Sequence, residues 1–376
     1  MKKVVILGGG VGGTIVANAL ADSTRPEDAE ITLISESTKH VYQPGFISVA
    51  FGSEKPDSLI HDERKLLSDR VKFVVAKAQK IDVKNKRVEV GEKKYDYDFL
   101  VVAVGARYNP KEIPGYEESA YHFYDVAHAL KLREALAGFT GGKILVGVGS
   151  VPYKCPPAPL EFTLLLDEYF VKKGMRNVVD IDYFYPINGV FTIKSVEPTL
   201  AKLLDDRKIP YHVFFNTESI DPVKKEVHSL EGETLVYDLL VMTPPHRGAK
   251  VVEDSGLGDR GGWLPTDKTT LKAKGYDEIY GLGDCTDLPI SKSGSAAHFQ
   301  SKIIADSLAS EIYGEPTDVK YDGHVECFLE TGYGKGIVLN FNYTKPPKPT
   351  QPNRIAHWEK ALLNRLYWST VPKARV

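Results

Sequence analysis

The sequence predicts an α/β fold in which two similar parallel-sheet domains precede a smaller C-terminal region. In each predicted domain an apolar strand runs into a glycine-rich turn, first over residues 4–13 and again over 143–149. A passage around Tyr97-Asp98 also recurs around Tyr237-Asp238, 140 positions later, as expected for a duplicated unit. The 376 residues suffice for two or three domains of ordinary size.

Composition argues against several classes of protein. The 48 Lys and Arg against 50 Asp and Glu leave a net charge of −2, which gives no electrostatic signal for a nucleic-acid partner. No apolar stretch approaches the roughly 18–20 residues that span a bilayer, and Val4–Leu7 is too short for a signal peptide. We therefore expect a protein of the cytoplasm, or of a membrane surface that faces it. Three cysteines are too few to form a disulfide framework that stabilises a chain of this size.

The first domain begins with a strand, a glycine turn and a helix. The turn carries the pattern G-x-G-x-x-G at Gly8, Gly10 and Gly13. In this pattern the first glycine permits a tight turn, the second admits a pyrophosphate, and the third lets helix and strand pack closely. The next strand, 31–35, ends in Glu36, an acidic residue placed to bind ribose hydroxyls. The sequence therefore predicts a Rossmann-like dinucleotide-binding domain.

Two later strand ends belong to the same predicted domain. The strand 97–104 is followed by Gly105, and the strand near 279–281 is followed by Gly283-Asp284 and then by a helix. An aspartate and helix N-terminal amides at such a position suit a phosphate or a polyol chain. We expect these strand ends to lie beside the first glycine turn.

The second domain, placed at 111–235, departs from the dinucleotide pattern. Its turn reads Gly147-Val-Gly149-Ser-Val-Pro152, with proline where the third glycine should allow close packing. Its next strand, 178–184, runs into Tyr185-Pro186 with no acidic residue at its end. A nicotinamide dinucleotide would lack both its pyrophosphate turn and its ribose ligand. We predict that this domain keeps the Rossmann-like fold and has lost the ligand.

The C-terminal region, 313–376, ends in a predicted amphipathic helix over about 354–368. Apolar and aromatic residues fall at helical spacings, at Ile355, Trp358, Leu362, Leu366 and Tyr367. The charged residues Glu359, Lys360 and Arg365 lie elsewhere around the helix. Such a helix suits a membrane-surface anchor. It equally suits docking on its own domain or on another subunit.

Together these landmarks resemble the two-dinucleotide-domain flavoprotein superfamily, with a first domain made of 1–110 and 236–312. The resemblance implies FAD as cofactor, with its pyrophosphate on the Gly8–Gly13 turn, its adenosine ribose at Glu36 and its ribityl chain at Asp284. The same resemblance gives cofactor contacts to Gly105, Gly283 and Lys292.

Two cysteines narrow the resemblance. Cys155 lies in a Lys-Cys-Pro-Pro segment after the altered turn, and Cys327 lies 172 positions later. Both contexts are similar to sulfide:quinone oxidoreductase and to the flavoprotein subunit of flavocytochrome c sulfide dehydrogenase. That resemblance implies a redox-active disulfide or polysulfide bridge beside the flavin, with Glu161 as a proton acceptor. A disulfide is an electrophile that hydrosulfide can open, so these residue types suit sulfide oxidation.

The family pattern is incomplete in this chain. No cysteine precedes Cys155, whereas many relatives carry one there, in some of them as a tether for the flavin. We therefore expect non-covalent FAD and leave the sulfur product open. Cys285 is expected to be a bystander, and the ten histidines show no ligand spacing that predicts a metal site.

On the acceptor side, the family takes up a quinone in an apolar pocket formed largely by the C-terminal region. Residues matching that region include Phe328, Tyr333 and Phe341. The leading prediction is thus a peripheral membrane flavoenzyme that oxidises sulfide and reduces a membrane quinone, with its oligomeric state open.

Two other functions stay open. A type II NADH:quinone dehydrogenase shares the scaffold but needs an intact second dinucleotide turn, which Pro152 argues against. A flavoprotein subunit that docks a cytochrome or iron–sulfur partner and relays electrons would explain a terminal helix shielded in a complex.

Overall fold

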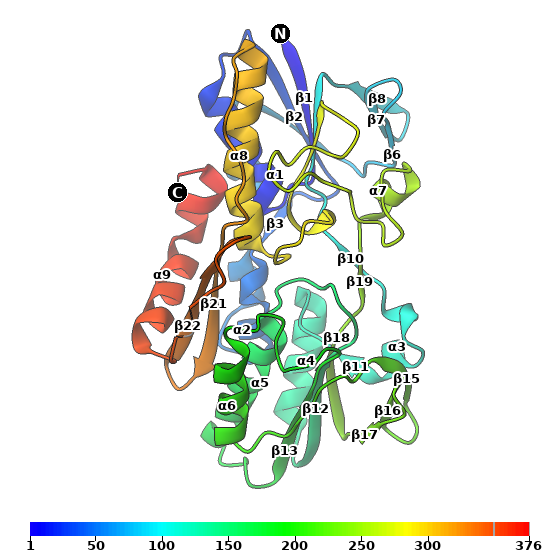
Figure 1. Ribbon diagram of the computed structural model, residues 1–376, viewed down its shortest axis with the longest axis vertical. Helices are drawn as coiled ribbons and strands as arrows, with labels where there is room; N and C mark the ends of the chain where they lie inside the picture. The colour runs from blue at the N-terminus through cyan, green and yellow to red at the C-terminus, as the bar shows by residue number, and fades with distance from the viewer. Residues whose placement is uncertain (349, 376) are drawn as a thin grey trace.

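The computed structural model describes residues 1–348 and 350–375 and confirms the α/β fold (Figure 1). The first parallel sheet has the strand order β20-β9-β1-β2-β5. Its strands are Ile279–Gly281, Phe99–Val102, Lys2–Leu7, Ala29–Ser35 and Val71–Val75. Helices α1 (Val11–Ser23) and α8 (Gly294–Tyr313) pack together beside this sheet. Because helices and loops cover the sheet, central residues such as Val4 and Val101 are fully buried.

The second parallel sheet has the strand order β11-β18-β12-β13-β14. Its strands are Ala120–Tyr121, Leu239–Thr243, Gly142–Val148, Val179–Phe184 and Tyr211–His212. The helices of this domain are α4 (Val126–Gly138), α5 (Ala158–Lys172) and α6 (Glu197–Asp206). The chain therefore contains two Rossmann-like sheets, as the sequence predicts.

Equivalent contacts in the two domains support the duplication. The Asp98 carboxylate accepts a hydrogen bond from the Lys3 amide at 2.7 Å, and the Asp238 carboxylate accepts one from the Lys143 amide at 2.8 Å. Each aspartate comes after a three-stranded sheet and begins a return to the parallel sheet. These three-stranded sheets are β6-β7-β8 (Lys80–Asp82, Arg87–Val90, Lys93–Asp96) and β15-β16-β17 (Thr217–Asp221, Glu226–Ser229, Thr234–Val236).

The chain crosses between the two domains through a short antiparallel pair, β10 (Arg107–Tyr108) with β19 (His246–Arg247). The expected return to the first domain at residue 236 is therefore too early. Strand β18 pairs with β11 and β12 of the second sheet, because the apolar run 239–243 fills a fully buried central position there.

The C-terminal region is a hairpin followed by a helix. Strand β21 (Val325–Gly332) pairs with β22 (Lys335–Phe341) and packs against α5, and α9 (Arg354–Thr370) lies along the hairpin (Figure 1). No helix among the described residues is long and apolar enough to cross a membrane. The remaining short elements are β3 (Lys39–Val41), β4 (Ile60–Asp62), α2 (Phe46–Ala50), α3 (Tyr116–Ser119) and α7 (Lys250–Asp254).

Candidate active site

The first glycine turn has the shape that a pyrophosphate requires. Gly8 has a φ of +105°, and a Cβ there would lie 2.3 Å from the carbonyl oxygen of Ala103. A Cβ on Gly13 would lie 2.0 Å from the carbonyl oxygen of Gly8, so neither position admits a side chain. Beside Gly10, in contrast, no atom lies within 4 Å of the Cβ position. The open space at Gly10 adjoins the N-terminus of α1, where phosphate is stabilised.

The other predicted cofactor contacts lie at the carboxyl ends of the same sheet. Glu36 directly follows β2 and is exposed, and Gly105 follows β9 with open space at its Cβ position. Gly283-Asp284 follows β20, and Asp284 Oδ1 is buried without a hydrogen-bond partner among the described residues. Burial raises the pKa of Asp284, while the charges of Lys154 and Lys292 oppose the rise. An unpaired buried acceptor here fits a ribityl hydroxyl.

In the second domain the equivalent turn is closed. A Cβ on Gly147 would lie 2.1 Å from the ring of Phe184, so the aromatic ring covers the strand end. The loop 149–157 then separates β12 from α5, which begins only at Ala158. No helix N-terminus therefore follows the turn directly, and the pyrophosphate site of this domain is missing.

The loop that replaces this phosphate turn carries Cys155. The amide of Cys155 donates to the carbonyl of Lys292 at 2.6 Å, and its own carbonyl accepts from the Ala158 amide at 2.8 Å. These bonds hold Cys155 at a φ of +53°, an uncommon value for a residue with a side chain. The loop is thus fixed between α5 and the strand end that carries Asp284.

Cys327 lies on β21 opposite Leu339 and is half-buried. Both cysteines carry free thiols. Cys155 keeps exposed surface, yet partial desolvation raises the pKa of its thiol, and the charge of Cys327 adds to the rise. Burial raises the pKa of Cys327 to about 11. The tertiary structure therefore brings the two predicted redox cysteines, 172 residues apart, into one electrostatic environment.

Glu161 lies in the first turn of α5 and is paired with a lysine from the C-terminal helix. Lys360 Nζ lies 2.5 Å from Glu161 Oε1, and the amide of Glu330 donates to Oε2 at 3.2 Å. Burial raises the pKa of Glu161, and Lys360 opposes this rise. The charge of Lys360 also lowers the pKa of both cysteines. The sequence placed Lys360 only on the polar part of the helix. Its pairing with Glu161 could not be predicted, because the two residues lie 199 positions apart.

Two further lysines surround the Asp284 strand end. Lys292 Nζ donates to the carbonyl of Thr286 at 2.5 Å and lies 3.9 Å above the Trp263 ring. Burial lowers the pKa of Lys292. Lys154 is also buried, and its Nζ donates to the hydroxyl of Tyr108 at 2.9 Å. Lys154 is a residue that sequence reasoning missed, although its position next to Cys155 was a usable signal.

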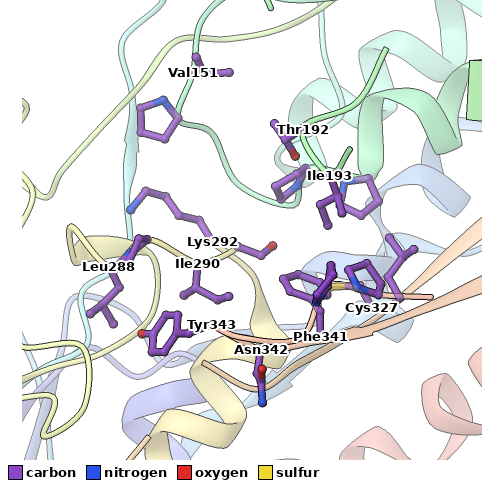
Figure 2. A pocket seen from close by; sticks show the side chains of 18 of the residues that line it. Val151, Thr192, Ile193, Leu288, Ile290, Lys292, Cys327, Phe341, Asn342 and Tyr343 are labelled. Carbon is purple, nitrogen blue, oxygen red and sulfur yellow. The ribbon is translucent and has the colours of Figure 1, made fainter. Parts of the chain in front are cut away.

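A cavity of about 860 Å³ is lined by Cys327 and by Pro156 and Pro157, which follow Cys155 in the chain (Figure 2). Its mostly apolar wall includes Cys327, Lys292 and Trp263, and one side is formed by the proline-rich loop before α5. Phe341 lies on the same face of the β21–β22 hairpin as Cys327, because it pairs with Val325, two positions before Cys327. Cys327 can therefore meet a small molecule that enters this cavity.

Comparisons with known proteins agree with this geometry. The pyridine nucleotide-disulphide oxidoreductase family model matches residues 2–153. The mitochondrial sulfide:quinone oxidoreductase of Mus musculus is 29% identical, over 98% of this chain and 85% of the mouse protein. The X-ray structure of the sulfide:quinone oxidoreductase from Aquifex aeolicus has a TM-score of 0.88 at 24% identity, and covers 100% of this chain and 92% of that chain. The chain is a flavoenzyme related to the sulfide:quinone oxidoreductases.

A second group of relatives shares the scaffold of this flavoenzyme. The type II NADH:quinone oxidoreductase of Staphylococcus aureus is 26% identical, over 97% of this chain and 94% of that protein. FAD is the cofactor, and the first-domain residues fit it: the closed glycines at 8 and 13, the open space at Gly10 and the unpaired Asp284 oxygen. When bound, FAD supplies two-electron redox chemistry.

The predicted quinone contacts of the flavoenzyme do not share one pocket. Phe341 lines the cavity, whereas Phe328 lies on the opposite face of the hairpin because it is one position from Cys327. Tyr333 lies at the exposed hairpin turn, where its hydroxyl donates to Asp167 at 3.0 Å. The spacing along the strand separates these residues, since successive side chains point to opposite faces.

Two remaining groups have structural partners. The Cys285 thiol is buried and donates to the carbonyls of Val102 and Leu282 at 3.3 and 3.2 Å. These contacts are consistent with a structural position outside the redox chemistry. One potential ligand atom from each of His122, Asp125 and His128 lies within 4.8 Å of the others. The spacing of the histidines in the sequence did not predict this cluster. The Asp125 carboxylate caps α4 and contacts His128 at 2.7 Å, so it has a structural role in starting this helix.

Proposed function

We propose that this flavoenzyme oxidises sulfide through Cys155 and Cys327 and passes the electrons through non-covalent FAD to a membrane quinone. One observation carries the proposal: the second-domain nucleotide turn is replaced by a loop that presents Cys155 near Cys327. The relatives named sulfide:quinone oxidoreductase support the same conclusion.

The cysteines provide the covalent chemistry. In the oxidised enzyme they share a disulfide, and hydrosulfide attacks one sulfur. A new S–S bond forms to the incoming sulfur, the Cys155–Cys327 bond breaks, and one cysteine becomes a persulfide while the other leaves as a thiolate. When the disulfide or polysulfide reforms, two electrons are released, which bound FAD would accept, and the sulfur leaves at the zero-valent level.

Glu161 and Lys360 provide a site for the proton that hydrosulfide releases when it is oxidised. Because burial raises the pKa of Glu161, its carboxylate can hold a proton that a solvated glutamate would lose. The Lys360 ammonium compensates the carboxylate when that proton is absent. The pair therefore provides a buried proton acceptor close to both cysteines.

The outer face of α9 supports association with a membrane surface. Its exposed apolar side chains are Ile355, Trp358, Leu362, Leu363 and Leu366, with exposed fractions of 70, 68, 56, 48 and 41%. A contiguous apolar stripe with tryptophan and basic neighbours suits an interfacial helix. A quinone dissolved in the bilayer would then be available beside the C-terminal region.

A second candidate function is NADH:quinone oxidation, favoured by the Staphylococcus aureus relative. The closed turn at Gly147 opposes it. Anaerobic addition of sulfide or NADH to the FAD-loaded protein separates the two, because only a competent donor bleaches oxidised flavin. We expect bleaching by sulfide at low concentration; bleaching by NADH with none by sulfide would overturn the proposal.

A serine substitution tests the cysteine mechanism directly. Cys327→Ser should retain FAD and lose sulfide-driven bleaching by at least about 100-fold, since no disulfide can form. Cys285→Ser provides a matched control at a buried thiol and should keep near-normal bleaching. Unchanged turnover in Cys327→Ser would remove the disulfide from the mechanism.

A further inference from the structure

The glycine turn of the first domain, Gly8–Gly13, rests on two buried side chains. The Thr14 hydroxyl lies 2.8 Å from the carbonyl oxygen of Gly10 and 2.6 Å from Glu63 Oε1. A Cβ on Gly9 would lie 3.5 Å from the carboxyl carbon of Glu63, so this fully buried side chain packs directly against the turn. Thr14 and Glu63 therefore help to fix the backbone that receives the pyrophosphate.

The same contacts continue to the C-terminal end of α9. The ring of His40 is fully buried, with Nδ1 2.8 Å from Glu63 Oε2 and Nε2 2.8 Å from the hydroxyl of Tyr367. Tyr367, near the end of α9, is itself buried. Thr14, Glu63, His40 and Tyr367 thus form one hydrogen-bonded chain that connects the first turn of α1 to α9.

Asn18 makes a second connection between α1 and the C-terminal segment. It lies one helical turn after Thr14 and is buried. Its Nδ2 donates to the carbonyls of Leu66 at 2.9 Å and of Pro372, just beyond α9, at 2.7 Å, and its Oδ1 accepts from the amide of Ser68 at 2.7 Å. Because Asn18 is buried, removal of Pro372 would leave one of its donors unpaired, which is costly.

Stacked aromatic rings attach the end of α9 to the first domain. The ring of Trp368 stacks on His61 of β4, with centroids 3.8 Å apart and planes at 7°. The ring of Tyr367 packs against Tyr42, with centroids 4.4 Å apart. The first half of α9 is held differently, since it rests on the β21–β22 hairpin. The two halves of the helix therefore have separate attachments.

We propose that the end of α9, residues 364–370, is an allosteric clamp on the glycine turn of the first domain. When docked, it holds Glu63 through His40 and holds α1 through Asn18, so that the turn keeps the shape that FAD requires. When it is released, buried groups of this chain lose their partners and the turn loosens. Docking and FAD binding therefore stabilise each other, because coupling between two sites is reciprocal. The inference requires FAD as the cofactor and is independent of sulfide as the electron donor.

Flavin affinity tests one direction of this coupling. FAD is titrated in lipid-free buffer into flavin-depleted, full-length protein, and the dissociation constant is obtained from flavin fluorescence. Trp368→Ala removes the stacked ring and should raise this constant at least about fivefold, the lower end of the usual range for coupled sites. Trp358→Ala removes the same ring from the exposed face of α9 and should leave the constant within about twofold.

Hydrogen exchange tests the other direction in the wild-type chain. FAD should slow amide exchange in residues 364–370 at least about threefold more than in residues 355–362, which rest on the hairpin. This measurement needs no variant, so it separates coupling from any loss of folding in Trp368→Ala. Equal FAD affinity of folded Trp368→Ala and wild type, or equal slowing of exchange in the two halves of α9, would overturn the proposal.

Discussion

At the scale of single residues, Lys360 shows how a distant side chain sets the chemistry of a thiol pair. The lysine is largely buried against Glu161, and its charge lowers the pKa of Cys155 and Cys327. Burial acts in the opposite direction and dominates, since the pKa of Cys327 reaches about 11. At neutral pH the reduced cysteines are therefore mostly thiols, and Lys360 preserves part of their thiolate population.

Substitution of this lysine should change the pH dependence of thiol reactivity. Only thiolates react with iodoacetamide, so alkylation of reduced Cys327 should increase about tenfold per pH unit below its pKa. Lys360→Met raises that pKa further and should slow alkylation at pH 8 by about three- to tenfold. Arg365→Met, at an exposed position of the same helix, provides the control. Identical pH profiles for Lys360→Met and wild type would contradict this role.

At the scale of secondary-structure elements, α9 joins three parts of the molecule. On its inner face, His357 lies 2.9 Å from Glu330 of the hairpin, and Lys360 pairs with Glu161 of α5. Near its end, the hydroxyl of Tyr367 lies 2.8 Å from His40 Nε2. The outer face keeps the exposed apolar stripe described above. The two interpretations of the helix, docked or membrane-facing, are therefore compatible, because each uses a different face.

The outer face should control association with vesicles. Trp358→Ala combined with Leu362→Ala removes two large exposed side chains, each worth about 1.5–3 kcal/mol when buried in an apolar phase. We expect at least about tenfold weaker sedimentation with phosphatidylcholine–phosphatidylglycerol vesicles. A matched double variant, Glu359→Ala with Arg365→Ala, leaves the net charge unchanged and should bind normally. Normal binding by the apolar variant would exclude this face as the principal anchor.

The inner face should contribute to stability through a buried hydrogen-bond chain. His40 and Glu63 are fully buried 2.8 Å apart, and the Thr14 hydroxyl donates to Glu63 at 2.6 Å. Tyr367→Phe leaves His40 Nε2 without its partner and should lower the free energy of unfolding by about 1–3 kcal/mol. Urea denaturation measures the change. Tyr313→Phe alters an exposed tyrosine and should have an effect below about 0.5 kcal/mol.

At the scale of the whole molecule, the two similar domains differ at their glycine turns. The first retains open space at Gly10 and an unpaired oxygen at Asp284. The second has Phe184 against Gly147 and a cysteine loop in place of the phosphate turn. One copy is thus suited to hold the cofactor, and the other supplies one of the two cysteines.

This difference predicts how nucleotides affect thermal stability. A ligand that binds the folded state raises the unfolding temperature. FAD should raise the midpoint of the flavin-depleted chain by several degrees, at about 1–2 °C per kcal/mol of stabilisation for a chain of 376 residues. NADH at millimolar concentration should leave the midpoint of the FAD-loaded chain within about 1 °C. A comparable rise with NADH would show that the second domain still binds a dinucleotide.

The sequence by itself determined the two parallel sheets, the glycine turn of the first domain that suits the cofactor, and the altered glycine turn of the second domain. These features depend on local patterns, since a strand followed by Gly8, Gly10 and Gly13 leaves few backbone conformations. Only the tertiary structure decided that β18 belongs to the second sheet and that Phe328, Tyr333 and Phe341 separate. It alone paired Lys360 with Glu161 and His40 with Tyr367. Such contacts join residues far apart in the chain, and burial, which gives them their energy, exists only after folding.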